Sequence, residues 1–194
     1  IFRQQPFALD GLPTEKALDP CVVRDHDGRF RLYYLAASRR FMEEPRHEIH
    51  WAASADGLRF REQGVAFARA TLVDPDVFPF GGKWFMYVFG GGTTVFATSA
   101  DGRQFDFGGP LALYGWGTTA PVPLDDGRLR LYAFGQWVRA GNPVCSFLST
   151  DGLTWKLEDG KRLVAGENEQ LTDPFVIRWQ GGWKMYFKVQ APPD

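Results

Sequence analysis

Short apolar stretches alternate with polar, glycine-rich turns along the whole chain. Residues 21–25 ("CVVRD") and 29–36 ("RFRLYYLA") are two such stretches, and the turn "DHDG" joins them. Two apolar runs on either side of a tight Asp-Gly turn predict a β-hairpin. No long stretch has the period of an amphipathic helix, so the pattern predicts an all-β protein.

The same hairpin recurs along the chain. In every copy a glycine precedes a tyrosine by five residues; the pairs are Gly28 and Tyr33, Gly82 and Tyr87, Gly127 and Tyr132, and Gly181 and Tyr186. A second motif, Ser-x-Asp-Gly-x-x-aromatic, begins at Ser54, Ser99 and Ser149 and alternates with the hairpin. A repeat of about 50 residues built from short strands predicts the blades of a β-propeller or a similar array.

We interpret each repeat as one four-stranded blade. The four repeats start near residues 19, 74, 120 and 173, and we expect residues 1–194 to form a single β-propeller domain. The N-terminal "FRQQPFAL" resembles the outer strand "FREQGVAF" that starts at Phe60. Residues 1–10 are therefore expected to be a closing outer strand, so that the last blade is shared between the N- and C-terminal strands. The repeats leave open a four-bladed ring or a piece of a larger propeller, and an incomplete ring would allow oligomerisation.

The composition of the chain argues against some classes of binding partner. Lys and Arg number 22 against 23 Asp and Glu, so a net charge of −1 favours neither nucleic acid nor an anionic membrane. No apolar run reaches the roughly 20 residues of a membrane helix. Cys21 and Cys145 are interpreted as small buried apolar residues, and a disulfide between them is the alternative. The sequence indicates no cofactor or metal site and no cellular location.

One face of the predicted propeller carries the long, varied loops. These loops contain four candidate site residues, which are Arg39, Trp116, Trp137 and Glu169. Sites gather on such loops, and the two tryptophans are expected to stack on a sugar or to seal the channel.

The Asp-Pro positions start the innermost strands on that same face. Asp19, Asp74 and Asp173 should therefore converge near the axis, with Thr119 and, at the position of the aspartate, Ala120 in the remaining sector. Clustered carboxylates separate their pKa values, which is how acid and base roles arise at neutral pH. The alternative is that each aspartate caps a turn between blades.

These motifs carry a family resemblance. The Asp-Pro strand, the Gly-x-x-x-x-Tyr strand and the Ser-x-Asp-Gly-x-x-aromatic turn resemble the five-bladed β-propeller glycosidases of glycoside hydrolase families 43 and 32, over essentially the whole chain. In family 43 an Asp of the first blade is the general base, an Asp of the second modulates the pKa, and a Glu-Gly-Pro of the third supplies the general acid.

The resemblance implies that Asp19 is the base and Asp74 the modulator. The third-blade position is Thr119 of "TAP", so the general-acid Glu is replaced, and Asp173 or Glu169 is the expected substitute. The function expected from the resemblance is that of a glycoside hydrolase acting on a furanoside or a related glycosidic bond. The alternative is a non-catalytic carbohydrate-binding or scaffold propeller, possibly reduced or truncated; in both cases the partner is a carbohydrate.

Overall fold

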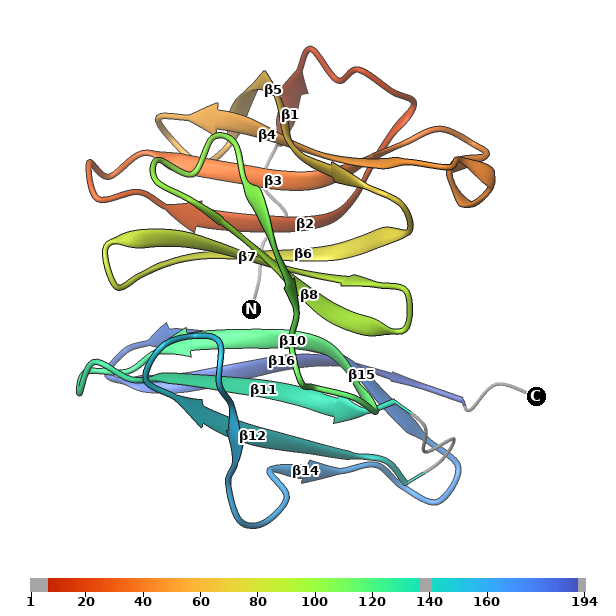
Figure 1. The fold of residues 1–194 in the computed structure, drawn as a ribbon, viewed down its shortest axis with the longest axis vertical. Helices are drawn as coiled ribbons and strands as arrows, with labels where there is room; N and C mark the ends of the chain where they lie inside the picture. Colours follow the sequence, from red (N-terminus) through yellow and green to blue (C-terminus); the bar gives the residue numbers. More distant parts are fainter. Residues whose placement is uncertain (1–6, 137–140, 192–194) are drawn as a thin grey trace. The chain divides into compact units, whose positions relative to one another are not determined.

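The computed structural model describes residues 7–136 and 141–191. It is built almost entirely of antiparallel strands, with one short 3-10 helix, η1 (Phe41–Glu43) (Figure 1). The chain divides into two compact units, residues 1–91 with 97–108 and residues 92–96 with 109–194. These are the first unit and the second unit, respectively.

The first sheet has the strand order β1-β5-β4-β3-β2. Its strands are β1 (Ala8–Asp10), β2 (Lys16–Arg24), β3 (Phe30–Ala37), β4 (His47–Ser54) and β5 (Arg59–Arg69). Alternate residues of β3 lie on one face of the sheet, where Leu32, Tyr34 and Ala36 pack with Ala52 and Phe60. The sheet thus follows the predicted blade, with one additional strand at its outer edge.

The second sheet has the order β6-β7-β8-β9. Its strands are β6 (Leu72–Phe80), β7 (Lys83–Gly90), β8 (Thr93–Ser99) and β9 (Asp106–Pro110). Aromatic side chains fill the core here: Phe78 stacks on Phe85 at 5.7 Å between ring centroids and meets Tyr87 edge-on at 4.9 Å. Strand β6 packs beside β2 of the first sheet.

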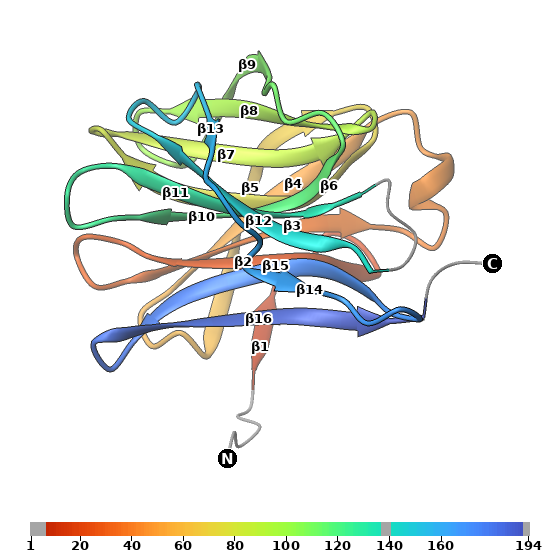
Figure 2. The same cartoon turned by 90° about the horizontal axis from the view of Figure 1, so that it is seen from below.

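The second unit holds the remaining two sheets. One has the order β10-β11-β12-β13, with β14 also paired to β12, and the other is the hairpin β15-β16 (Figure 2). The strands are β10 (Trp116–Pro123), β11 (Leu129–Gly135), β12 (Pro143–Ser149), β13 (Lys156–Leu157), β14 (Leu163–Val164), β15 (Gln170–Trp179) and β16 (Gly182–Gln190). The buried Asn142 side chain joins the two sheets, because it donates to Leu171 O and accepts from Leu171 N, both at 2.7 Å.

The all-β prediction is confirmed, and the side chains of the Ser-x-Asp-Gly motif stabilise its turn. In the first copy, the Ser54 hydroxyl accepts from the backbone N–H of Asp56 and Gly57, and the Asp56 carboxylate accepts from Leu58 N and Arg59 N. Side-chain acceptors that bond nearby amides are what stabilise such turns. The number of blades and the closure of one ring stay predictions.

The prediction for the N-terminal strand was wrong in the described residues. Ala8–Asp10 pair in parallel with β5 of the first sheet, and not with the C-terminal repeat. The chain turns at Gly11, where φ is 85°, and enters β2 of the same sheet within a few residues. Phe7 also packs against Phe60, with ring centroids 5.3 Å apart, so apolar contact and the short connection to β2 both keep this strand in the first unit.

Candidate active site

A strand bulge marks each Asp-Pro position. The pairing register shifts between Leu18 and Cys21, between Val73 and Asp76, and between Thr172 and Phe175. Asp19, Asp74 and Asp173 lie inside these bulges with φ of 52°, 52° and 50°. Bulges with a left-handed residue bend a strand and redirect a side chain.

This conformation is costly for the backbone. Left-handed φ is unfavourable for a residue with a Cβ by roughly 1–2 kcal/mol, and the following proline restricts the preceding residue further. Only two other non-glycine residues in the described part of the chain have positive φ, Thr71 and Gln180. Three strained aspartates at equivalent repeat positions therefore motivate the hypothesis of a functional site.

Two of these aspartates meet in the first unit. The Asp19 carboxylate accepts a hydrogen bond from the backbone N–H of Asp74, with Oδ2 3.3 Å from the nitrogen. The contact follows from the packing of β2 beside β6. The alternative prediction, in which each aspartate caps a turn between blades, expects this contact as well. The contact brings Asp19 and Asp74 together and agrees with both predictions.

A third carboxyl, Asp76, lies two residues farther along β6. Its Oδ1 accepts from the Cys21 thiol at 3.9 Å, and its Oδ2 is buried with no hydrogen-bond partner among the described residues. Burial, and secondarily the charge of Asp74, raise the pKa of Asp76 to about 8. This carboxyl therefore holds its proton at neutral pH beside the bulge aspartates. Burial also raises the pKa of the Cys21 thiol, which stays protonated.

Asp76 is not among the residues predicted from the sequence. A signal was present, since "DPD" puts a second carboxylate at the start of an otherwise apolar strand. Its burial, however, depends on packing between distant segments, since its hydrogen-bond partner Cys21 is 55 residues away in sequence. Such a contact is visible only once β2 and β6 are side by side.

The aspartate of the second unit has a different surrounding. The Asp173 carboxylate accepts from the Thr118 hydroxyl at 3.0 Å and from the Thr172 hydroxyl at 3.3 Å. It also forms an ion pair of 2.7 Å with Lys188 Nζ. All three partners donate to the carboxylate, so the group is arranged as a hydrogen-bond acceptor.

The strand register corrects the sequence alignment of the third repeat. The residues paired with the repeated tyrosine are Cys21, Asp76, Ala120 and Phe175. Two positions earlier stand Asp19, Asp74 and Asp173 and, in β10, Thr118. Matching the prolines had put Ala120 at the aspartate position. The bulge in β10 lies at another place, between Trp116 and Thr119, and Pro121 continues the strand there.

The other predicted residues have local contacts. Arg39 is exposed and pairs with Glu15 at 3.1 Å. Trp116 lies edge-on to Phe147 at 5.1 Å, which is packing within its own sheet. Thr119 is opposite Ala133 on β11.

The remaining two predicted residues are Glu169 and Trp137. Glu169 is exposed, and its carboxylate accepts from Gly166 N at 3.2 Å, which closes its own loop. Trp137 lies outside the described residues.

The structure thus brings Asp19 and Asp74 together in the first unit and Asp173 together with Thr118 in the second. A common pocket for all three aspartates stays a prediction. In the part of the chain that the structure describes, no three His, Cys, Asp or Glu side chains are grouped to hold a metal ion. No helix among these residues has the length and apolar character needed to cross a membrane.

Several solved structures resemble this fold. No protein-family model and no curated protein matches the chain. Among solved structures, a thermostable family-43 glycoside hydrolase matches with a TM-score of 0.72 and 17% identity, over 90% of this chain and 64% of that one. The endo-arabinase from Bacteroides thetaiotaomicron matches with a TM-score of 0.62 and 15% identity, over 91% of this chain and 76% of that one.

A third structure has another activity. An N-acetylgalactosamine deacetylase from F. plautii, in complex with blood group B trisaccharide, matches with a TM-score of 0.70 and 13% identity, over 88% of this chain and 62% of that one. The chain therefore shares its fold with these solved structures, the family-43 glycoside hydrolase among them, as the sequence motifs predicted. At this identity the likeness establishes the fold and leaves the chemistry to the side chains.

Proposed function

We propose that the chain acts on a glycosidic bond in the manner of a glycoside hydrolase, with a furanoside as its substrate. The observation that carries the proposal is the set of aspartates held at positive φ in the first-strand bulges, in a fold shared with glycoside hydrolases. A carboxylate held in a strained conformation next to other carboxyls is suited to catalysis and is hard to explain by stability alone.

Each carboxyl of the first unit has a distinct role in this proposal. Asp19 is the general base that takes a proton from the attacking water. Asp74 is the modulator. It lies beside Asp19, because its backbone N–H donates to the Asp19 carboxylate at 3.3 Å. Asp76 does not touch substrate, because its Oδ2 is buried, and it acts as a neutral neighbour that adds no further negative charge at pH 7.

Neither candidate for the general acid has contacts that suit a proton donor. Asp173 and Glu169 are the two candidates, yet Asp173 accepts from Thr118 and Lys188, and Glu169 closes its own loop. A general acid must donate a proton, and its contribution is typically about 10²–10⁴-fold. We therefore expect turnover of furanosides whose leaving group departs unaided, such as nitrophenyl furanosides, and little cleavage of natural oligosaccharides.

The test compares Asp19→Asn with the wild-type protein on a panel of nitrophenyl furanosides. Loss of the base should lower kcat/KM by about 10²–10⁴-fold, whereas Asp159→Asn, an exposed carboxylate of the second unit, should leave it unchanged. Thermal unfolding of each variant checks that the fold survives. Equal turnover by wild type and Asp19→Asn would contradict the proposal.

A non-catalytic carbohydrate-binding propeller is the second candidate. It is favoured by two observations: Thr118, which has no carboxyl, stands at the aspartate position of β10, and the Asp173 carboxylate accepts from Thr118 and pairs with Lys188. Titration with arabino-, xylo- and fructo-oligosaccharides separates the two. Binding without turnover of any nitrophenyl furanoside, even after Thr119→Glu, would establish the binding function.

A further inference from the structure

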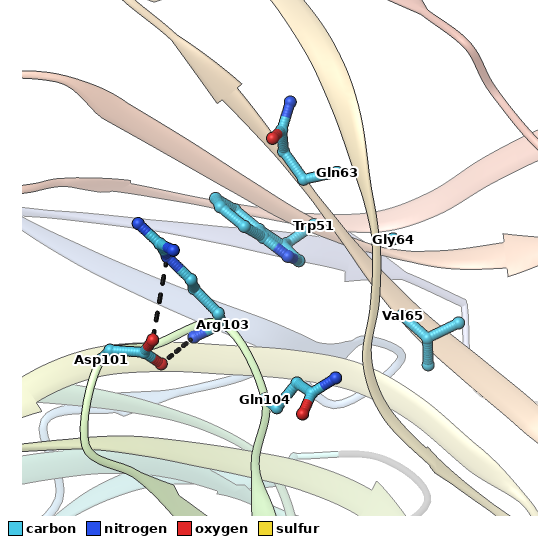
Figure 3. Close-up of a pocket in the computed structure, with 7 residues that line it drawn as sticks. All are labelled: Trp51, Gln63, Gly64, Val65, Asp101, Arg103 and Gln104. Atoms are coloured by element: carbon cyan, nitrogen blue, oxygen red, sulfur yellow. Dashed lines mark hydrogen bonds and ion pairs between the residues drawn. The ribbon is translucent and has the colours of Figure 1, made fainter.

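A cavity lies in the first unit, and its lining does not include the bulge aspartates. It has a volume of about 610 Å³ and is open to solvent on one side. Trp51 on β4 and Gln63 to Val65 on β5 form one wall, and Asp101, Arg103 and Gln104 of the β8–β9 turn form the other (Figure 3). Strands β3 and β4 separate β5 from β2, the strand that carries Asp19, so this cavity belongs to a different part of the unit.

The tryptophan of this cavity packs against a fixed arginine. The Arg31 guanidinium lies 5.5 Å from the Trp51 ring and 4.6 Å from the Trp84 ring. Arg31 is itself fixed, since it donates to the Asp25 carboxylate at 2.8 Å and to Asp101 O at 2.5 Å. A ring fixed in this way loses little conformational entropy when a ligand packs on it.

The strand geometry keeps the space in front of the ring open. The pairing of β4 with β5 shifts between Trp51 and Ala52, and Gly64 lies opposite Trp51 with φ of 120°. A Cβ built on Gly64 would meet no atom within 4 Å. The bulge and the missing side chain therefore create the hollow, and a larger residue would have to adopt a left-handed conformation that it rarely takes.

Planar polar groups surround the apolar ring. The Gln63 amide donates to Arg61 O and Glu62 O through Nε2, so its Oε1 is available as an acceptor. Gln104 presents a second amide from the facing turn. Arg103 Nε lies 3.8 Å from the Asp101 carboxylate, so the cavity has both donors and acceptors and no net charge from this pair.

We propose that this cavity is a carbohydrate-binding site, separate from the bulge aspartates, that takes a neutral saccharide. The apolar C–H face of a sugar ring packs on Trp51, while its hydroxyls bond the amides of Gln63 and Gln104 and the Arg103–Asp101 pair. An aromatic platform with amide and charged groups at its edge matches a ligand with one apolar face and a rim of hydroxyls. The site requires no catalysis and so stands independently of the proposed function.

The test is calorimetric titration of arabino-, xylo- and fructo-oligosaccharides into variants that lack the bulge carboxylates. In the Asp19→Asn, Asp74→Asn background, at least one saccharide should still bind. Adding Trp51→Ala should weaken this binding by at least about tenfold, and Gln104→Ala on the exposed turn should weaken it without touching the packing of Arg31. Trp183→Ala is the matched control, because Trp183 is an exposed tryptophan of the second unit (44% exposed).

The outcomes separate this site from the proposed active site. Trp51→Ala and Gln104→Ala should leave kcat on nitrophenyl furanosides unchanged, whereas Asp19→Asn should lower it. Unchanged affinity in both Trp51→Ala and Gln104→Ala, or no binding of any member of the panel to the Asp19→Asn, Asp74→Asn protein, would overturn the assignment. Loss of binding in these variants together with failure of every furanoside assay would leave this site standing and remove only the catalytic proposal.

Discussion

The two units carry the same kind of strand bulge next to different chemistry. In the first unit Asp19 and Asp74 lie on neighbouring strands, and a buried Asp76 packs against the Cys21 thiol. In the second unit Thr118 stands at the aspartate position of β10, and the Asp173 carboxylate contacts its hydroxyl and Lys188. The first set is acidic and partly removed from water, whereas the second is compensated by a cation that water reaches.

This difference separates what the backbone repeats from what it does not. The bulge recurs at each Asp-Pro position because an aspartate tolerates left-handed φ better than most residues and the proline fixes the next residue. Whether a carboxyl nearby holds a proton or a charge depends on its neighbours. Burial keeps the proton on the Asp76 carboxyl, whereas hydrogen-bond donors surround the Asp173 carboxylate. A repeated fold thus gives its units separate electrostatic properties.

The largest expected effect is the pH dependence of the first unit's stability. Burial and Asp74 raise the pKa of Asp76 from its ordinary value of 3.8 to about 8. The folded state therefore keeps a proton that the unfolded chain releases above about pH 4. The stability that Asp76 contributes is complete below that pH and is lost as pH rises through about 8. Between about pH 4 and about pH 8, the free energy of unfolding measured with urea should fall as pH rises. The slope should approach about 1.4 kcal/mol per pH unit, which corresponds to one proton.

Two variants sharpen this prediction. Asp76→Asn removes the titrating group, so the difference in unfolding free energy between wild type and variant should change steadily with pH. Asp74→Asn should move the loss of stability to lower pH, because the charge of Asp74 contributes to the raised pKa of Asp76. Parallel pH profiles for wild type and Asp76→Asn would show that Asp76 is ionised in the folded protein.

The next effect compares the bulges themselves. At Asp19, Asp74 and Asp173, where φ is positive, alanine should be less stable than glycine by about 1–2 kcal/mol. Thr118 does not have positive φ, so there the order should reverse, with glycine less stable than alanine by about 0.5–1 kcal/mol. Chemical denaturation of the four Gly and Ala pairs measures this. The same order at all four positions would mean that the backbone of β10 matches the other bulges.

Local patterns made the strands and turns predictable from the sequence. The Gly-x-x-x-x-Tyr spacing indicated the hairpins, and the second copy of the serine turn forms as the first does, with Ser99 accepting from Gly102 N at 3.0 Å. Such features depend on residues within a few positions of one another. The bulge aspartates were singled out for the same reason, since Asp-Pro is visible as a dipeptide.

Features that depend on packing between distant strands were not predictable. Leu9 resembles part of an outer strand, but only its contact with the Phe60 cluster decides which sheet it joins. The register of β10 differs by two residues from the alignment of its proline, because the bulge and not Pro121 sets the pairing. The high pKa of Asp76 likewise arises from burial against a strand 55 residues earlier.

The smallest expected effect concerns the ion pair of the second unit. The Lys188 side chain is 71% exposed, so water and salt screen its 2.7 Å contact with Asp173. Lys188→Met keeps the aliphatic stem and should cost about 0–1 kcal/mol. Thr118→Val removes a hydroxyl that donates at 3.0 Å and should cost about 0.5–1.5 kcal/mol. Double-mutant cycles with Asp173→Asn measure both couplings, and raising the salt concentration should reduce only the coupling to Lys188. A coupling to Lys188 above about 2 kcal/mol that resists salt would show a desolvated ion pair, and the second unit would then hold its carboxylate as tightly away from water as the first holds Asp76.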